Sequence, residues 1–320
     1  MSWKRHLEFL VGTFAGLNAA LYLFVLAMNP FGNLPNWALP RHEIMDTNQR
    51  YQYPSVVRSG RYDSIITGTS TSRLFEPSAF ERIFGGRFAN VSIDAGTAWE
   101  QAQIIKLFLR HAKAPRTLVL GVDHVWCSPF ADSQRITFRG FPDWLYDDNP
   151  WNDLAFMYNI RAIEIAGRRV GSAFFGKRPR IREDGYEVFT PPESAYDIAK
   201  VNVKLYGERP REHPKPKVPP DLPSEDERAA WRFPALAWLQ EIASERRWQR
   251  IIFLSPPVHV VAQARPGTIE AAREIECRDR VARIARANGV AFVDFRISSS
   301  LTREDTNYWD PLHYRVGIAE

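Results

Sequence analysis

Apolar positions in this chain gather first in one long uncharged run near the amino terminus. Residues 9–28 contain no charged side chain, and twenty residues of α-helix extend about 30 Å, the thickness of the hydrocarbon core of a bilayer. Lys4 and Arg5 precede the run. Because basic residues mark the cytoplasmic side of a membrane segment, residues 1–30 are predicted to form a cytoplasmic tip and a transmembrane anchor, with the rest of the chain outside the cytoplasm.

Two other interpretations of this run differ from a retained anchor. Val25-Leu26-Ala27 offers a cleavage site for a signal peptide, although the apolar region of such peptides usually has about 7–15 residues. A buried core helix should carry a polar stripe, whereas the only polar side chains in the run are Thr13 and Asn18. We therefore expect a retained anchor.

After residue 58, short β-rich apolar runs alternate with segments of helical spacing. Strand-like runs cover residues 62–68, 88–93, 117–122, 250–254 and 290–295. Helical spacing covers residues 77–84, 98–111, 235–247 and 268–287. Strands that alternate with helices in this way predict an α/β fold built on a doubly wound, five-stranded parallel sheet with helices on both faces.

Two other stretches complete the predicted organisation. Residues 31–58 are rich in Pro, Asn and Tyr and are expected to be a connector to a domain that covers residues 59–320. Within that domain, about residues 127–227 form an aromatic-rich insertion that ends in a stretch with six prolines. A loop of this length is usually functional or disordered. The chain stops where the last helix should begin, so a truncated carboxyl end is one interpretation.

Charge and cysteine content narrow the choice of partners. The 42 Lys and Arg residues exceed the 37 Asp and Glu residues by only five, and both signs are interleaved, so we expect no nucleic-acid partner. An anionic glycan or lipid surface fits this balance of charges better.

Cys127 and Cys277 form no CxxC motif, so no zinc site is predicted. Two buried free thiols are favoured over a disulfide, which would require an oxidising compartment.

Ser70 follows the first predicted strand in the segment Gly68-Thr69-Ser70-Thr71-Ser72-Arg73. Reactive groups in open α/β sheets gather at the carboxyl ends of the strands. A serine at this place also meets the amino terminus of the next helix, whose free N–H groups favour a developing negative charge. Serine is equally a common helix N-cap, so the position alone does not assign a nucleophile.

A second motif favours a nucleophilic serine over a helix N-cap. Asp310-Pro311-Leu312-His313 follows the last predicted strand, which places it at the same sheet edge as Ser70. A carboxylate three residues before a histidine can hold the Nδ1–H of the imidazole, which leaves Nε2 to accept a serine proton. The two motifs together predict a serine acyl-transfer site.

The combination resembles the SGNH (GDSL-like) hydrolase superfamily over residues 60–125 and 250–320. Gly68-Thr69-Ser70 matches the Gly-Asp-Ser block of that family, with Thr in place of Asp. The resemblance implies a flavodoxin-like SGNH fold, Ser70 as nucleophile, Asp310 as the orienting acid and His313 as the general base. It also implies that the N–H groups of Ser70 and Gly96 contribute to an oxyanion hole.

One block departs from the family pattern. The family has Gly-x-Asn-Asp, in which the Asn side chain donates to the oxyanion, and this chain has Gly121-Val122-Asp123-His124. An ionised Asp123 cannot donate a hydrogen bond. His124 and Thr97 are alternative donors, and a slow, specialised or degenerate site is the other interpretation.

An anchor, an SGNH-like domain and this departure together are similar to surface-polymer acylation proteins, of the teichoic acid D-alanyl transfer and alginate acetylation types. The resemblance implies a cell-envelope glycan or acyl donor as substrate and a membrane-bound O-acyltransferase as partner. Arg73, His124 and His259 are candidate substrate-binding residues, although a solvated or ion-paired Arg73 and an ordinary loop histidine at position 259 are the favoured interpretations. No cofactor is expected, because the chain has no Walker loop, no GxGxxG after a strand and no HExxH.

Two functions therefore compete. The first is an extracytoplasmic serine O-acyltransferase or esterase that acts on an envelope carbohydrate and is located at the inner (cytoplasmic) membrane as a single-pass protein. The second is a catalytically degenerate module that binds glycan or acts as a scaffold for a membrane-bound enzyme. A tether without further function would leave the paired motifs unexplained.

Overall fold

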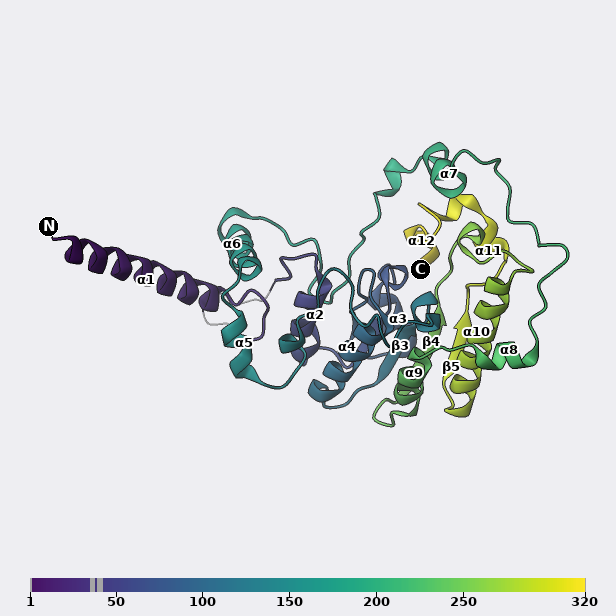
Figure 1. Cartoon of the computed structure of the whole chain (residues 1–320), viewed down its shortest axis with the longest axis horizontal. Coiled ribbons are helices and arrows are strands. Elements are labelled where there is room, and N and C mark those ends of the chain that lie inside the picture. Colours follow the sequence, from purple (N-terminus) through teal and green to yellow (C-terminus); the bar gives the residue numbers. More distant parts are fainter. Residues whose placement is uncertain (1, 35–37, 39–42, 320) are drawn as a thin grey trace.

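The computed structural model describes residues 2–34, 38 and 43–319. A single long helix, α1, projects from an α/β body, and the carboxyl terminus lies within that body (Figure 1). The described residues do not include Met1, Glu320 or part of the expected connector.

The body is built on five parallel strands. Their bounds are β1 (Ser64–Thr67), β2 (Phe88–Asn90), β3 (Thr117–Gly121), β4 (Arg250–Ser255) and β5 (Ala291–Asp294). The strand order is β2-β1-β3-β4-β5, and every neighbouring pair is parallel. The five-stranded parallel sheet expected from the sequence is confirmed. The first, second and fifth strands are shorter than expected, and β2 ends where the side chain of Asn90 accepts the N–H of Ser92.

Alternate residues of the strands contribute to two separate cores. One core contains Ile65, Leu118, Leu120 and Phe253, and the other contains Ile66, Val119 and Ile252. Successive side chains of a strand point to opposite faces of the sheet, so both faces are covered. This explains why the strands read as continuous apolar runs rather than as an alternation of apolar and polar residues.

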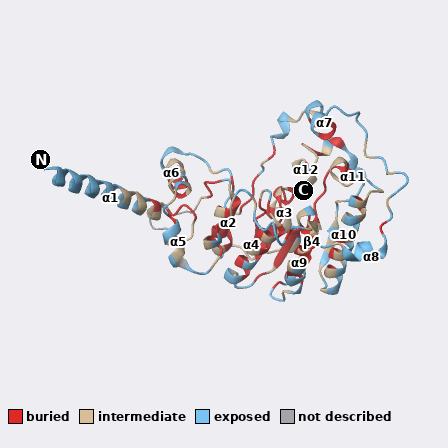
Figure 2. Ribbon diagram, viewed as in Figure 1, coloured by how far each residue is buried: buried red, intermediate tan, exposed pale blue. Residues whose placement is uncertain are grey.

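The helices divide between these faces. The first core includes residues of α2 (Gln49–Arg58), α4 (Ala98–His111), α9 (Ala235–Ser244) and α10 (Ile269–Ala287). The second includes residues next to or within α3 (Pro77–Phe84) and residues of the carboxyl-terminal segment that ends in α12 (Val316–Ala319). Burial is greatest along the sheet and the helices that cover it (Figure 2). The α4 bounds equal those predicted, because Thr97 and Glu100 form a capping box at its start.

Helix α1 (Trp3–Met28) is long and apolar enough to cross a membrane. Val25 is its one buried residue, so the alternative of a buried core helix is wrong. Figure 2 shows most of α1 exposed, with intermediate burial only toward its carboxyl end.

Part of the expected connector is a packed helix. Arg50 of α2 forms a buried ion pair with Glu100 of α4, with 2.7 Å between Nε and Oε1. The same guanidinium donates to the carbonyl oxygens of Asp94 and Ala95. Residues 49–58 therefore belong to the body, although their polar sequence gave no sign of burial.

The insertion at about 127–227 is a series of short elements that extends around the body. The insertion follows η2 (His124–Cys127), and its elements are η3 (Asp143–Leu145), α5 (Pro150–Phe156), α6 (Ile160–Phe175), η4 (Glu193–Ala195), α7 (Ile198–Tyr206) and the start of α8 (Glu225–Ala230). The remaining short elements are η1 (Ser70–Ser72), η5 (Val260–Ala262), α11 (Ser300–Arg303) and η6 (Asp305–Asn307). The proline-rich stretch between α7 and α8 has no helix or strand.

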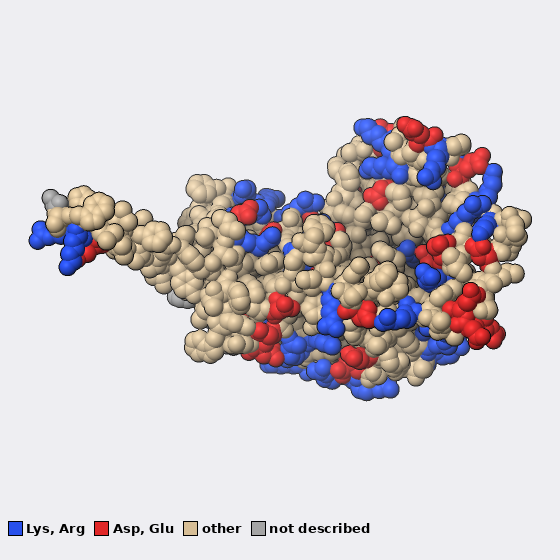
Figure 3. Space-filling model, viewed as in Figure 1, with Lys and Arg blue, Asp and Glu red and all other residues tan. Residues whose placement is uncertain are grey.

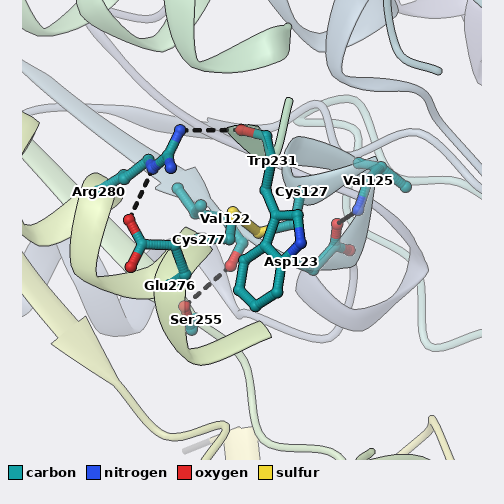
Figure 4. The surroundings of a disulfide bond; sticks show 9 residues. All are labelled: Val122, Asp123, Val125, Cys127, Trp231, Ser255, Glu276, Cys277 and Arg280. Atoms are coloured by element: carbon teal, nitrogen blue, oxygen red, sulfur yellow. Dashed lines mark hydrogen bonds and ion pairs between the residues drawn. A yellow bond between two sulfur atoms is a disulfide. The ribbon is translucent and has the colours of Figure 1, made fainter. Parts of the chain in front are cut away.

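Cys127 and Cys277 form a disulfide that joins η2, just after β3, to α10. The expectation of two free thiols is therefore wrong. The pairing joins residues 150 positions apart, and nothing in the local sequence indicates it. Figure 4 shows this bond beside the Asp123 loop at the end of β3, with Trp231 among its surroundings.

Candidate active site

Ser70 begins a single 3-10 turn, η1, directly after β1. Helix α3 begins at Pro77, as predicted, so Ser70 lies in a 3-10 turn and does not meet the amino terminus of that helix as expected. Ser72 packs against Gly68 and Gly121, where a Cβ atom would lie 2.4 Å and 2.1 Å from its Oγ. The two glycines thus let the turn approach the ends of β1 and β3 closely.

The three predicted catalytic side chains meet at this turn. Nε2 of His313 lies 3.0 Å from Oγ of Ser70, and Nδ1 of His313 lies 2.9 Å from Oδ2 of Asp310. Both distances are within the range for a nucleophile, its base and the group that orients the base. Since the carboxylate can only accept, the imidazole proton is on Nδ1 and Nε2 accepts the serine hydroxyl.

Asp310 is held as an anion by its own loop. Oδ1 accepts the N–H groups of Leu312 at 2.9 Å and His313 at 3.0 Å. Partial burial raises the pKa of Asp310, but the hydrogen bonds from the His313 ring and from these two N–H groups outweigh burial, and the net pKa lies below the ordinary value. The carboxylate is therefore ionised at neutral pH.

Tyr314, which sequence reasoning missed, joins the two halves of the site. Its buried hydroxyl donates to the carbonyl oxygen of Thr71. Thr71 follows Ser70 and Tyr314 follows His313, so this bond fixes the two loops next to the reacting groups. A tyrosine after a DxxH motif carries no recognisable pattern, and only the tertiary contact identifies it.

Asn90 is a second residue that the sequence analysis did not identify as part of the site. Its side-chain amide donates to the carbonyl oxygens of Ser72 and Phe75, each at 2.9 Å. These bonds fix the chain between η1 and α3. A polar residue at the end of a buried strand is the one sequence feature that could have indicated it.

The insertion covers one side of the site. The ring of Phe189 contacts the ring of His313 edge to face, with centroids 5.2 Å apart. The guanidinium of Arg73 lies 4.4 Å above the same Phe189 ring and donates to the buried carboxylate of Glu187. Arg73 is buried in this ion pair, which agrees with the ion-paired alternative rather than with a substrate contact. It attaches the insertion to the loop that carries Ser70.

Of the N–H groups expected to bind an oxyanion, that of Ser70 is free to donate in the part of the chain that the structure describes, and that of Gly96 is already engaged. The N–H of Ser70 has no hydrogen-bond acceptor among the described residues, which leaves it free for an oxyanion. The N–H of Gly96 donates to the carbonyl of Ile93 at 2.9 Å. Thr97 is also engaged, with its N–H on Glu100 and its hydroxyl on the carbonyl of Arg135. Gly96 and Thr97 are therefore not placed to donate as expected.

Asp123 accepts hydrogen bonds and does not donate them. Its carboxylate accepts the hydroxyl of Thr69 and, at 3.5 Å, that of Thr71, and it also accepts the N–H of Val125 at 3.2 Å. The residue thus joins the nucleophile turn to the loop after β3. Its role in this structure is to position the residues on both sides of Ser70.

A cleft of about 320 Å³ opens next to Asp123, on the same edge of the sheet. Asp123, His124 and Ser255 line it from the ends of β3 and β4, and Arg273 and Arg278 of α10 line it from the other side. His124 is exposed. Ser70, Asp310 and His313 do not line this cleft, so it is adjacent to the three groups and separate from them.

His259 is buried and does not reach Ser70. Its Nε2 lies 3.1 Å from Oδ1 of Asp305, and its own backbone N–H donates to the carbonyl of Pro311 at 2.9 Å. The ring is enclosed, so His259 is not placed to contact substrate and is the structural loop histidine that was the favoured interpretation. His259 instead supports the loop that carries Asp310 and His313.

His213, His259 and Asp305 have ligating atoms within 4.8 Å of one another, a spacing that a metal ion requires. Nδ1 of His259 accepts the N–H of Val261, so the ring proton is on Nε2. The other oxygen of Asp305 accepts Nε of Arg211 at 2.6 Å. A proton on the ligating nitrogen and a cation on the carboxylate both oppose metal binding, and we assign the group a structural role.

No family model matches this chain, and no curated protein has a significantly similar sequence. The functional assignment therefore depends on the geometry of Ser70, Asp310 and His313 and on the fold that holds them. Those features place a serine hydroxyl, an imidazole and a carboxylate in hydrogen-bonding sequence at the carboxyl edge of a parallel sheet.

Proposed function

We propose that this protein is an extracytoplasmic serine acyl-transfer enzyme, an O-acyltransferase or esterase, that acts on a cell-envelope carbohydrate. The observation that carries the proposal is the hydrogen-bonding distance of 3.0 Å between Ser70 Oγ and His313 Nε2, with Asp310 on the far side of the ring. The same arrangement of roles operates in serine hydrolases of unrelated folds.

The chemistry follows from these positions. Oγ of Ser70 attacks the carbonyl carbon of an acyl ester while its proton passes to Nε2 of His313. The Ser70 N–H stabilises the oxyanion, the C–O bond to the leaving alcohol breaks, and His313 returns the proton to that alcohol. Water or a sugar hydroxyl then attacks the Ser70 ester by the same steps in reverse, which gives hydrolysis or transfer respectively.

Three features support a location outside the cytoplasm. Helix α1 has the length and composition of a membrane span. The basic residues Lys4 and Arg5 lie on its short amino-terminal side, which favours that side in the cytoplasm. The disulfide between Cys127 and Cys277 is of the kind that persists in oxidising compartments.

The substrate class comes from the resemblance. The strand order 2-1-3-4-5 is that of flavodoxin-like sheets, and the positions of Ser70, Asp310 and His313 agree with the order of the SGNH motifs. Membrane-anchored members of similar architecture modify surface polymers, and a membrane-bound O-acyltransferase as partner belongs to the same proposal.

The test is labelling with a fluorophosphonate probe that reacts with activated serines. We expect the full-length protein to be labelled and Ser70→Ala to lose labelling while it remains folded. Ser78→Ala in α3 is the matched control and should be labelled like the unmodified protein. Absence of labelling in a folded, full-length sample would contradict the enzymatic function.

The Asp123 carboxylate favours a second candidate, a module that binds glycan without catalysis. Removal of one oxyanion donor typically costs about 10²–10³ in rate, and this chain has an acceptor where the family has a donor. If catalysis is retained, Asp123→Asn should leave labelling unchanged or accelerate it, because the negative charge disappears while hydrogen bonding persists. If the second candidate is correct, Ser70→Ala and His313→Ala will leave the cellular phenotype intact.

A further inference from the structure

The surface around the carboxyl end of α1 carries large exposed apolar side chains. Helices α5 and α6 lie beside this end (Figure 1). The exposed fractions are 77% for Trp151, 53% for Phe156, 82% for Ile160, 72% for Phe174 and 82% for Phe175. Soluble surfaces rarely expose so many aromatic and aliphatic side chains in one region, and such regions mark contacts with membranes or proteins.

This region is firmly attached to α1. The buried guanidinium of Arg169 in α6 donates to the carbonyl oxygens of Met28 and Asn29, the latter at 2.8 Å. A cation at a helix carboxyl terminus is favourable because the free carbonyl groups there are negative. The hydroxyl of Tyr22 donates to the carbonyl of Leu154 in α5 at 2.9 Å. The position of α5 and α6 along the anchor is therefore fixed.

That position is next to the apolar part of the anchor. The hydroxyl of Tyr158, between α5 and α6, donates to the side chain of Asn18. Asn18 lies ten residues before Met28, which is about 15 Å along the helix. Asn18 is within the apolar run that follows Glu8, the last charged residue before it. The tip of Tyr158 therefore lies beside the apolar part of the anchor.

The charge distribution also fits a lipid surface. Lys177 and Arg178 are exposed, and a single glycine separates them from Phe174 and Phe175. Aromatic side chains beside exposed basic ones are typical of segments that lie in the interface of anionic membranes. Figure 3 shows no charged atoms on α1 between its amino-terminal tip and the body, and both basic and acidic groups beside α6.

We propose that residues 150–178 form an interfacial platform that inserts its apolar side chains into the outer leaflet and places Lys177 and Arg178 on anionic headgroups. The proposal depends on the membrane-anchored arrangement given above and is independent of the chemistry at Ser70. It adds a second contact with lipid beside α1, which holds the body at a fixed place on the bilayer instead of on a loose tether. A protein partner on the same surface is the competing occupant.

The test uses the full-length protein in vesicles of phosphatidylcholine with phosphatidylglycerol. The variants Phe156→Cys and Phe175→Cys are each labelled with the environment-sensitive dye NBD, without reductant, so that the Cys127–Cys277 disulfide stays closed. Leu17→Cys in α1 is the control for lipid contact. Leu222→Cys, in the proline-rich stretch, is 82% exposed and is the control for water contact.

Doxyl-labelled lipids should quench the dye at positions 17, 156 and 175 and leave it unchanged at position 222, and aqueous iodide should do the opposite. Replacing Lys177 and Arg178 by Ala should reduce the quenching at position 175 in these vesicles toward its value in pure phosphatidylcholine. Quenching by iodide at positions 156 and 175 would overturn the proposal. Protection from both quenchers would also overturn it, in favour of a protein partner. Loss of lipid quenching at position 17 would contradict the membrane anchor itself. The chemistry at Ser70 is tested separately by fluorophosphonate labelling.

Discussion

The hydroxyl of Ser70 and Nε2 of His313 lie 3.0 Å apart, although 243 residues separate them in the chain. The bond from the Tyr314 hydroxyl to the Thr71 carbonyl joins the next residue of each loop. Because this second bond lies one residue away from the first on each loop, it fixes the distance between Ser70 and His313.

Asp310→Asn should reduce the rate of fluorophosphonate labelling by about 10²–10⁴-fold, because an amide no longer selects the tautomer that leaves Nε2 free to accept. The rate is measured by the time course of labelling. Asp294→Asn, at the end of β5 and outside the site, is the matched control. A rate within twofold of the unmodified protein for Asp310→Asn would show that Asp310 does not orient His313 for proton transfer.

Glu187→Gln should destabilise the protein by about 3–5 kcal/mol, because it leaves the buried guanidinium of Arg73 without its counter-charge. Glu183→Gln breaks an exposed pair with Arg61 in the same segment and should cost about 0–1 kcal/mol. Urea unfolding of both variants measures the difference. Equal effects would mean that Arg73 is solvated in solution.

Replacement of Cys127 and Cys277 by serine should lower the free energy of unfolding by about 2–5 kcal/mol, because the bond closes a long loop in the unfolded chain. The disulfide also holds the loop after β3, which contains Asp123, against α10. Non-reducing mass spectrometry checks the bond, and unfolding in the presence and absence of reductant checks the energy. If reductant still lowers the stability of the double-serine variant, the disulfide is not the cause of the reductant effect.

Stability should fall as the pH drops below about 6.5, in part because of His259. Burial lowers the pKa of His259, and its attraction to Asp305 only partly opposes this. The unfolded chain then binds a proton near pH 6.5 that the folded chain refuses until its lower pKa, so protonation favours unfolding between these values. The pair of His259 and Asp305 is also faced by the side chains of Arg211, Tyr206 and His213.

The urea midpoint at several pH values between 5 and 8 measures this dependence. His259→Gln should have a shallower slope than the unmodified protein, and His213→Gln is the matched control for the neighbouring, less enclosed histidine. Identical slopes for His259→Gln and the unmodified protein would show that another group is responsible.

The sequence by itself determined the periodic parts of the fold. The five apolar runs became the five parallel strands, and the 98–111 segment became α4 with the same bounds, since its capping residues are adjacent in sequence. Sequence reasoning also brought Ser70 and the Asp310–His313 pair to one sheet edge, because parallel strands end on the same side.

Tertiary structure alone decided the contacts that have no local pattern. The pairing of Cys127 with Cys277, the ion pair of Arg73 with Glu187 and the bond from Tyr314 to Thr71 each join distant segments. Their partners are fixed by the path of the whole chain around the sheet, and that path depends on the sum of many weak contacts. Periodicity reports only which residues share a face within one element, so it could not supply them.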